Sequence, residues 1–243
     1  KRGINFVNVP TTLLAMVDAS VGGKTGINFG GLKNEIGAFA FPQTVIIDTQ
    51  WLETLDHENL LSGYAEMLKH GLITERKLLP TLLNFDTATF NLHQLSDMLK
   101  VSVAIKEQIV EQDPHEQGIR KALNFGHTFG HAFEEWAMTR HPILHGYAVA
   151  YGMVCELYLS AIKQGFPQTI MRQTVNFIRN NYGTLPITCD DYDALISLMI
   201  HDKKNAGNNI NFSLLHDLGS VVINRTATEE EIKDALDFLR EGV

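Results

Sequence analysis

The chain has 243 residues, and 20 Lys and Arg against 28 Asp and Glu give a formal net charge of −8 at pH 7. Its 44% hydrophobic and 20% charged residues are ordinary for a globular protein and exclude a disordered chain. The acidic balance argues against a binder of nucleic acid or anionic membranes. Two cysteines cannot build a disulfide framework, and no apolar run approaches the ~18 residues that span a bilayer. We therefore expect a cytoplasmic protein of one large domain or two small ones.

Two short β-like runs and a glycine-rich stretch occupy the first 50 residues. Residues 4–9 alternate between apolar and polar side chains, and residues 44–49 have the pattern of a short buried strand. Residues 11–20 look helical, and the stretch 22–37 is rich in glycine. Because a strand begins so near Lys1 and no methionine precedes it, we expect that an N-terminal part of a longer protein is missing.

From about residue 51 the apolar residues recur with the 3.6-residue period of helices. This period predicts helices at 57–73, 76–85, 93–112, 119–138, 144–163, 167–181 and 190–201. A late pair of strands is expected at 209–215 and 221–223. A last helix is expected to open at Thr228, whose hydroxyl and three following glutamates suit the positive end of a helix dipole.

Histidine is the one unusual count, since four of the ten lie between His127 and His145. His127 and His131 are four residues apart, which on a helix places both on one face with the spacing of two ligands of one metal. A Thr stands at position 128, which excludes the His-Glu-x-x-His motif of zinc proteases. A single histidine is more often structural, but the three histidines His127, His131 and His145 together favour a metal site.

Two glycines accompany these histidines. Gly126 and Gly130 are also four residues apart, and on a helix they leave a bare stripe that another backbone or a ligand can approach. Each glycine inside a helix costs roughly 1 kcal/mol relative to alanine. A close contact that offsets this cost is therefore expected.

A catalytic zinc site takes three nitrogen or oxygen ligands and keeps one position open. Beside two of the histidines, the third ligand could be His131 or a carboxylate. Glu66 is a good candidate because its neighbours are apolar or small, and Lys69 and His70 follow on the same helical face. A solvated surface pair of Glu66 and Lys69 is the simpler explanation of that segment alone.

Glycines flank Lys24 in a segment that is similar to a phosphate loop at first sight. Asp18 stands where a P-loop requires glycine, and no G-x-G-x-x-G is present, so any anion contact would come from backbone amides. The alternative is an ordinary surface loop. Other polar and basic candidates are Lys33, Asn34, Lys106, Arg120, Asn124, Lys203 and Lys204. Lys203 and Lys204 end a predicted helix, and the favourable interaction of cations with the negative end of the helix dipole is enough to explain their presence there.

Together these segments resemble the 3-dehydroquinate synthases over nearly the whole chain. The markers are the segments 9–15, 17–26 and 123–131 and the pair Glu66 and Lys69. The resemblance implies an α/β remnant of an NAD-binding domain at 1–55, followed by a mainly α-helical zinc- and substrate-binding domain at 56–243. It also implies a homodimer, and the glycine-rich NAD half of the family precedes the first residue here.

The resemblance implies a role for each matching residue. Zinc, with Co²⁺ as a substitute, would be held by Glu66, His127 and His145. His131 becomes a proton-relay residue rather than a ligand, and the other catalytic residues are Lys69, Lys24 and Asn124. The substrate contacts are Arg2, Asp18, Asn34, Lys106, Arg120, Lys203 and Lys204. The NAD contacts are Thr11, Thr12, Asp18, Lys24, Lys33, Trp51, Leu52, Glu53 and Thr54.

The reaction that the resemblance implies converts 3-deoxy-D-arabino-heptulosonate 7-phosphate into 3-dehydroquinate and phosphate, a step of the shikimate pathway and aromatic amino acid biosynthesis. Three alternatives stay open: a sister sugar-phosphate cyclase acting on another heptulose phosphate, a metal-dependent polyol dehydrogenase, and a non-catalytic helical metal-binding module. The sequence departs from the family pattern at Tyr147, where most members carry Glu, and at Glu35, commonly a leucine.

Overall fold

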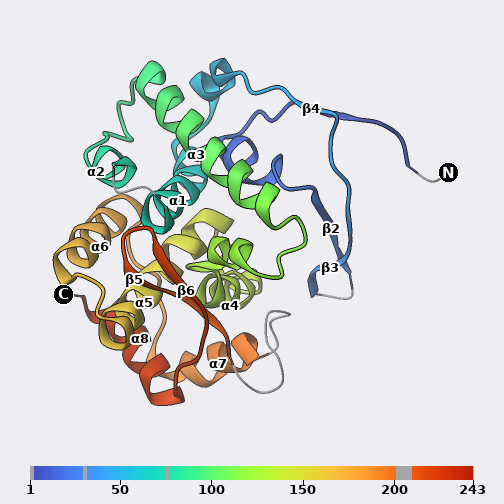
Figure 1. The fold of residues 1–243 in the computed structure, drawn as a ribbon. Coiled ribbons are helices and arrows are strands. Elements are labelled where there is room, and N and C mark those ends of the chain that lie inside the picture. Colours follow the sequence, from blue (N-terminus) through green and yellow to red (C-terminus); the bar gives the residue numbers. More distant parts are fainter. Residues whose placement is uncertain (1–2, 30–31, 75–76, 201–209, 243) are drawn as a thin grey trace.

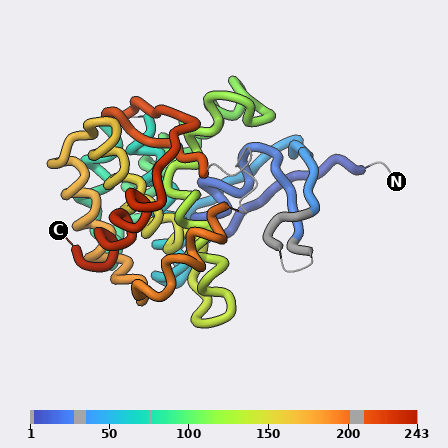
Figure 2. Tube along the Cα trace, turned by 90° about the horizontal axis from the view of Figure 1, so that it is seen from below, coloured from blue at the N-terminus to red at the C-terminus, as the bar shows by residue number. Residues whose placement is uncertain are grey.

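The computed structural model describes residues 3–29, 32–74, 77–200 and 210–242, and the side chains of residues 28–35 lie outside the description. A helical body forms most of the molecule, and an N-terminal segment extends from it (Figures 1 and 2). Within the described ranges, no helix has both the length and the apolar character that crossing a membrane requires. The expected fold class, an α/β remnant followed by a mainly helical region, is confirmed. The domain boundary at residue 55 stays a prediction.

Two small sheets lie in the N-terminal segment. A parallel pair joins β1 (Val7–Asn8) to β4 (Thr44–Val45), and an antiparallel hairpin joins β2 (Lys24–Phe29) to β3 (Leu32–Phe39). Between β1 and β2 lies a short π-helix, η1 (Ala15–Ala19).

The alternative of an ordinary surface loop around Lys24 is therefore wrong, because Lys24 begins a strand of the hairpin. Gly26 and Gly37 are paired across the hairpin, and a Cβ at Gly37 would lie 2.5 Å from the carbonyl oxygen of Thr25, so glycine here permits close strand pairing. The β-branched Ile27 and Ile36 face each other in the same register. The Gly-Gly pair at positions 30 and 31, between these two segments of the sequence, was the available signal for a hairpin.

The helical body follows the predicted order closely. Its α-helices are α1 (His57–Ile73), α2 (Leu78–Leu83), α3 (Leu92–Gln112), α4 (His127–Met138), α5 (His145–Gln164), α6 (Gln168–Tyr182), α7 (Tyr192–Ile200) and α8 (Glu229–Glu241). Short 3₁₀ helices are η2 (Thr49–Thr54), η3 (Ile119–Asn124) and η4 (Cys189–Asp191). The late strand pair is confirmed as the antiparallel β5 (Phe212–Asp217) and β6 (Ser220–Arg225). Thr228 caps α8 as expected, in a capping box with Glu231.

One predicted helix, at 119–138, is wrong in its continuity. Gly126 has φ +80°, a left-handed conformation that no helix interior accepts, so the chain forms η3, turns, and then begins α4. Gly126 is thus the residue before α4 rather than a residue inside it. The helical cost expected for two glycines applies to Gly130 alone.

Helix α1 lies in the interior of the body and packs against η1, α2, α3 and α5. Asp56 caps its start by accepting a hydrogen bond from the backbone N–H of Asn59 at 2.9 Å. Every residue from 60 to 73 is buried. Glu66 and Lys69 of this helix are therefore removed from water and need partners inside the protein.

Candidate metal centre and the charged residues around it

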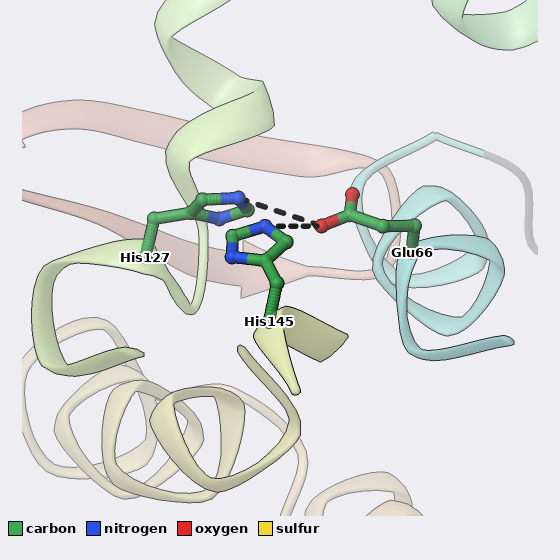
Figure 3. A group of neighbouring side chains, drawn as sticks. All are labelled: Glu66, His127 and His145. Atoms are coloured by element: carbon green, nitrogen blue, oxygen red, sulfur yellow. Dashed lines mark ion pairs between the residues drawn. The ribbon is translucent and has the colours of Figure 1, made fainter. Parts of the chain in front are cut away.

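Three helices bring one carboxylate and two imidazoles together. The Nε2 atoms of His127 and His145 lie 3.4 and 3.6 Å from Oε1 of Glu66, and one ligand atom of each residue lies within 4.8 Å of the others. Glu66 comes from α1, while His127 and His145 are the first residues of α4 and α5. Figure 3 shows the two rings pointing at the same carboxylate oxygen.

Glu66 offers this oxygen without a competing partner. Its side chain is fully buried, its Oε2 forms an ion pair with Lys69, and its Oε1 has no hydrogen-bond partner among the described residues. Burial alone would raise the pKa of Glu66, but Lys69 and then His127 hold that pKa well below its usual range. A buried, charged and unpartnered carboxylate oxygen suits a bound cation.

Both histidines are fixed through their other ring nitrogen. Nδ1 of His127 lies 3.1 Å from the carbonyl oxygen of Phe125, and Nδ1 of His145 lies 3.0 Å from Oε2 of Glu134. Burial lowers the pKa of His145, but Glu134 and Glu66 outweigh it and raise that pKa to about 9. Metal-bound histidines characteristically have such carbonyl or carboxylate partners, which turn Nε2 toward the metal. The donor set of two imidazoles and one carboxylate fits Zn²⁺.

His131 lies beside this group rather than in it. It is one turn after His127 on α4, and the two rings meet edge to face with centroids 5.4 Å apart. The group of close ligand atoms contains Glu66 and not His131. Of the two candidates for the third ligand, the geometry favours the carboxylate.

A second charged pair joins η1 to α3. Nζ of Lys106 donates to the carbonyl oxygen and to Oδ1 of Asp18, and the Lys106 side chain is buried. Burial raises the pKa of Asp18, but the charge of Lys106 outweighs it and lowers that pKa to about 2. The electrostatic influence of Glu66 and Lys69 also reaches Asp18, so the two pairs form one charged region.

Arg120 and its neighbours extend this region. The buried Arg120 guanidinium donates to the carbonyl oxygens of Gly22 at 2.9 Å and Pro114 at 2.6 Å. Burial lowers the pKa of Arg120. A Cβ at Gly22 would lie 2.6 Å from Nη2, so only glycine lets the backbone approach this closely.

Glu116 links two further predicted residues. Its Oε1 accepts a hydrogen bond from Asn124 at 2.7 Å, and its Oε2 forms an ion pair with Lys24. Lys24 of the hairpin and Asn124, the last residue of η3, therefore contact the same carboxylate.

Comparison with known proteins identifies the family. The family model for the N-terminal part of 3-dehydroquinate synthase matches residues 1–62, and that for the C-terminal part matches residues 63–205. The chain belongs to the 3-dehydroquinate synthase family. A 3-dehydroquinate synthase of Parabacteroides distasonis is 56% identical over 243 residues, which are 100% of this chain and 69% of that protein.

Two solved structures show the same fold in related cyclases. ValA, a 2-epi-5-epi-valiolone synthase of Streptomyces hygroscopicus with NAD⁺ and Zn²⁺ bound, has a TM-score of 0.87 and 26% identity, over 99% of this chain and 67% of that one. A 2-deoxy-scyllo-inosose synthase complexed with carbaglucose-6-phosphate, NAD⁺ and Co²⁺ has a TM-score of 0.83 and 25% identity, over 100% and 68%. The chain thus spans about two thirds of the length of each relative. The resemblance to the 3-dehydroquinate synthases that the sequence indicated is confirmed.

Some of the remaining predicted site residues lie in the described part of the chain, and the others lie outside it. Thr11, Trp51 and Glu53 are exposed on the N-terminal segment, whereas Leu52 is fully buried in the hydrophobic core, where it is closed to a cofactor. The hydroxyl of Thr12 accepts from the N–H of Ala15, and that of Thr54 donates to the carbonyl oxygen of Trp51. Outside the described residues or side chains lie Arg2, Lys33, Asn34, Glu35, Lys203 and Lys204.

Three carboxylates of the site were missed in the sequence: Glu116, Glu134 and Glu156. Glu134 follows His127 by seven residues, and this spacing on one helical face was an available signal. Glu156 lies three turns after His145 in an apolar run, which also marks it as buried. Glu116 is in a loop, and nothing in the local pattern identifies it.

Proposed function

We propose that the chain carries the metal and substrate site of a 3-dehydroquinate synthase. This enzyme converts 3-deoxy-D-arabino-heptulosonate 7-phosphate into 3-dehydroquinate and phosphate, with NAD and Zn²⁺ as cofactors. The observation that carries the proposal is the convergence of Glu66, His127 and His145 in a chain that is 56% identical to a curated 3-dehydroquinate synthase. A homodimer in the cytoplasm belongs to the same proposal.

The three convergent residues would hold the metal. When bound there, Zn²⁺ supplies a Lewis acid that lowers the pKa of a substrate hydroxyl. The chain's own part is to fix the metal by two imidazoles whose Nδ1 atoms are already engaged and by a carboxylate with a free oxygen. Lys69 neutralises the other oxygen of Glu66 and so permits a buried charge at this place.

The basic residues around the centre provide the charge that an anionic sugar phosphate requires. Lys106 is a buried cation bonded to Asp18 of η1, and Arg120 is a buried cation bonded to Gly22, which follows η1. Arginine offers a bidentate fork to carboxylate or phosphate, whereas lysine offers a point charge. The polar and basic residues assigned to the substrate are Arg2, Asp18, Asn34, Lys106, Arg120, Lys203 and Lys204. Those assigned to NAD are Thr11, Thr12, Asp18, Lys24, Lys33 and residues 51–54.

His131 is the proposed proton carrier. It is half-buried next to the metal group and is not one of the three converging residues, and an imidazole at this place suits holding or moving a proton of the substrate. Lys69, Lys24 and Asn124 are the other proposed catalytic residues, and they bind and orient the substrate.

A sister cyclase is the second candidate, because two structures of similar fold are cyclases with other names. The decisive experiment incubates the full-length protein with Zn²⁺, NAD and 3-deoxy-D-arabino-heptulosonate 7-phosphate and measures released phosphate. The proposal predicts stoichiometric phosphate and 3-dehydroquinate. Absence of phosphate from this substrate, together with its release from another heptulose phosphate, would establish the sister activity instead.

A further inference from the structure

Helix α4, which begins at His127, has no cap from its own segment. The preceding residue, Gly126, has φ +80° and offers no side chain. The first N–H groups of a helix have no partner within that helix. The N–H groups of Gly126 and Thr128 therefore need acceptors from elsewhere, and the direction of the intervening His127 depends on how they are held.

Glu156 of the neighbouring helix α5 supplies both acceptors. Its Oε2 accepts from the N–H of Gly126 at 2.7 Å, and its Oε1 accepts from the N–H of Thr128 at 3.1 Å. The side chain is fully buried, where a carboxylate is costly unless it is hydrogen-bonded and faces positive charge. The positive end of the α4 dipole meets this requirement. Glu156 of α5 thus caps the N-terminus of α4.

The same face of α5 carries the second histidine of the metal centre. Glu156 and His145 are separated by 156 − 145 = 11 residues, about three helical turns. At the other end of the contact, Nδ1 of His145 lies 3.0 Å from Oε2 of Glu134 on α4. One carboxylate at each end therefore joins the two helices that begin with the metal-binding histidines.

Glycines let the backbones of these two helices approach closely between the two carboxylate contacts. A Cβ at Gly152 would lie 2.0 Å from the carbonyl oxygen of Gly126 and 2.7 Å from the nitrogen of Gly130. A Cβ at Gly130 would lie 3.1 Å from the carbonyl oxygen of Ala148. The backbones of α4 and α5 are in direct contact at these glycines. This close packing, together with the two carboxylate contacts, holds α4 in one register along α5.

We propose that Glu156 is a positioning residue for the metal centre: by capping α4 it directs His127 toward the oxygen of Glu66 that His145 also faces. The inference rests on the proposed function only in that Glu66, His127 and His145 hold a divalent metal. Glu156 is not a member of that group and acts through the backbone on either side of His127.

The test compares E156Q with a matched control on the same helix, in the full-length protein. Glutamine keeps the size of the side chain but removes its charge and turns an NH₂ toward one of the two backbone N–H groups. The control is S160A, because Ser160 is buried one turn further along α5. Its hydroxyl donates to the carbonyl of Glu156 at 2.6 Å and accepts from the N–H of Leu215 at 2.9 Å, and neither partner lies on α4.

Three readouts separate positioning from general stability: zinc affinity by chelator competition, the visible spectrum of the Co²⁺-substituted protein, and hydrogen exchange of residues 125–129 without metal. E156Q is expected to lose about 10- to 100-fold in zinc affinity, the usual effect of an outer-shell change, to alter the Co²⁺ spectrum and to speed exchange. S160A is expected to lower stability and to leave all three readouts at the parent values.

Parent zinc affinity and an unchanged Co²⁺ spectrum in E156Q would overturn the inference, as would an equal loss in S160A. A parent protein that binds no zinc would instead overturn the proposed metal centre itself. Should E156Q not fold, E156D carries the test, because it keeps the charge but retracts the carboxylate by one methylene. A smaller loss of zinc affinity is expected there, and parent values in all three readouts would again refute the positioning role.

Discussion

The buried His70 should make the fold sensitive to mild acid. Its Nδ1 lies 2.7 Å from Oγ of Ser102 on α3, its Nε2 has no partner among the described residues, and its side chain is fully buried. Burial, and then the charge of Lys69, lower the pKa of His70 to about 3. The folded protein therefore keeps this imidazole neutral well below pH 6.5, where a histidine of the unfolded chain is charged.

The direction and size of the effect follow from proton linkage. The pKa of histidine in an unfolded chain is about 6.5, so below this pH the unfolded state binds a proton that the folded state does not. The contribution of His70 to the free energy of unfolding is complete above pH 6.5 and is lost as the pH falls toward 3. Between pH 7 and pH 5 the loss is about 2 kcal/mol, since each unit below 6.5 is worth about 1.4 kcal/mol.

Urea unfolding of the parent and of H70N at pH 7 and pH 5, in the presence of a chelator, isolates this contribution. Other titrating groups contribute equally to both proteins, so the parent should lose about 2 kcal/mol more than H70N over this interval. S102A is the matched control: it removes the hydrogen bond but leaves the imidazole buried, and should lose stability at both pH values while keeping the parent's pH dependence. An identical loss in the parent and in H70N would refute the reasoning.

Further predictions concern the metal centre and the helix contact beneath it. His127→Ala and His145→Ala should each abolish bound zinc, and one zinc per chain by atomic absorption after either change would refute the ligand role. His131→Ala should keep its zinc but lose about 10²- to 10⁴-fold in turnover, as a proton carrier does; loss of the metal would show that His131 is a ligand. Gly152→Ala should destabilise the fold by more than about 3 kcal/mol in urea unfolding, because its Cβ would lie 2.0 Å from a backbone oxygen. Gly130→Ala, with its nearest backbone atom at 3.1 Å, should cost less, and equal costs would contradict this account of the contact.

The helices could be predicted from the sequence because their signal is local. A 3.6-residue period and an N-cap residue are properties of neighbouring residues, and α1, α5 and α8 begin within about a residue of their expected starts. The break at Gly126 could not be predicted in this way. A glycine in a helical pattern has the same local signal whether it lies inside the helix or turns the chain before it.

The three converging residues of the candidate metal centre were predictable from residue type, spacing and family resemblance, but their supporting contacts were not. Glu134 and Glu156 act across the contact between α4 and α5. Arg120 donates to the carbonyl oxygen of Gly22, which is distant in the sequence, and to that of Pro114 in the preceding loop. Such contacts depend on how the elements pack, which no short pattern encodes. The net charge of −8 likewise gave no indication that buried cations gather around one centre.

An anomalous difference map at the zinc edge tests the central claim most directly. Crystals of the full-length protein grown with Zn²⁺ should show one strong peak per chain, within about 2.0–2.2 Å of Oε1 of Glu66 and of Nε2 of His127 and His145. A peak bound by His131 in place of Glu66, or no peak between α1, α4 and α5, would contradict the account.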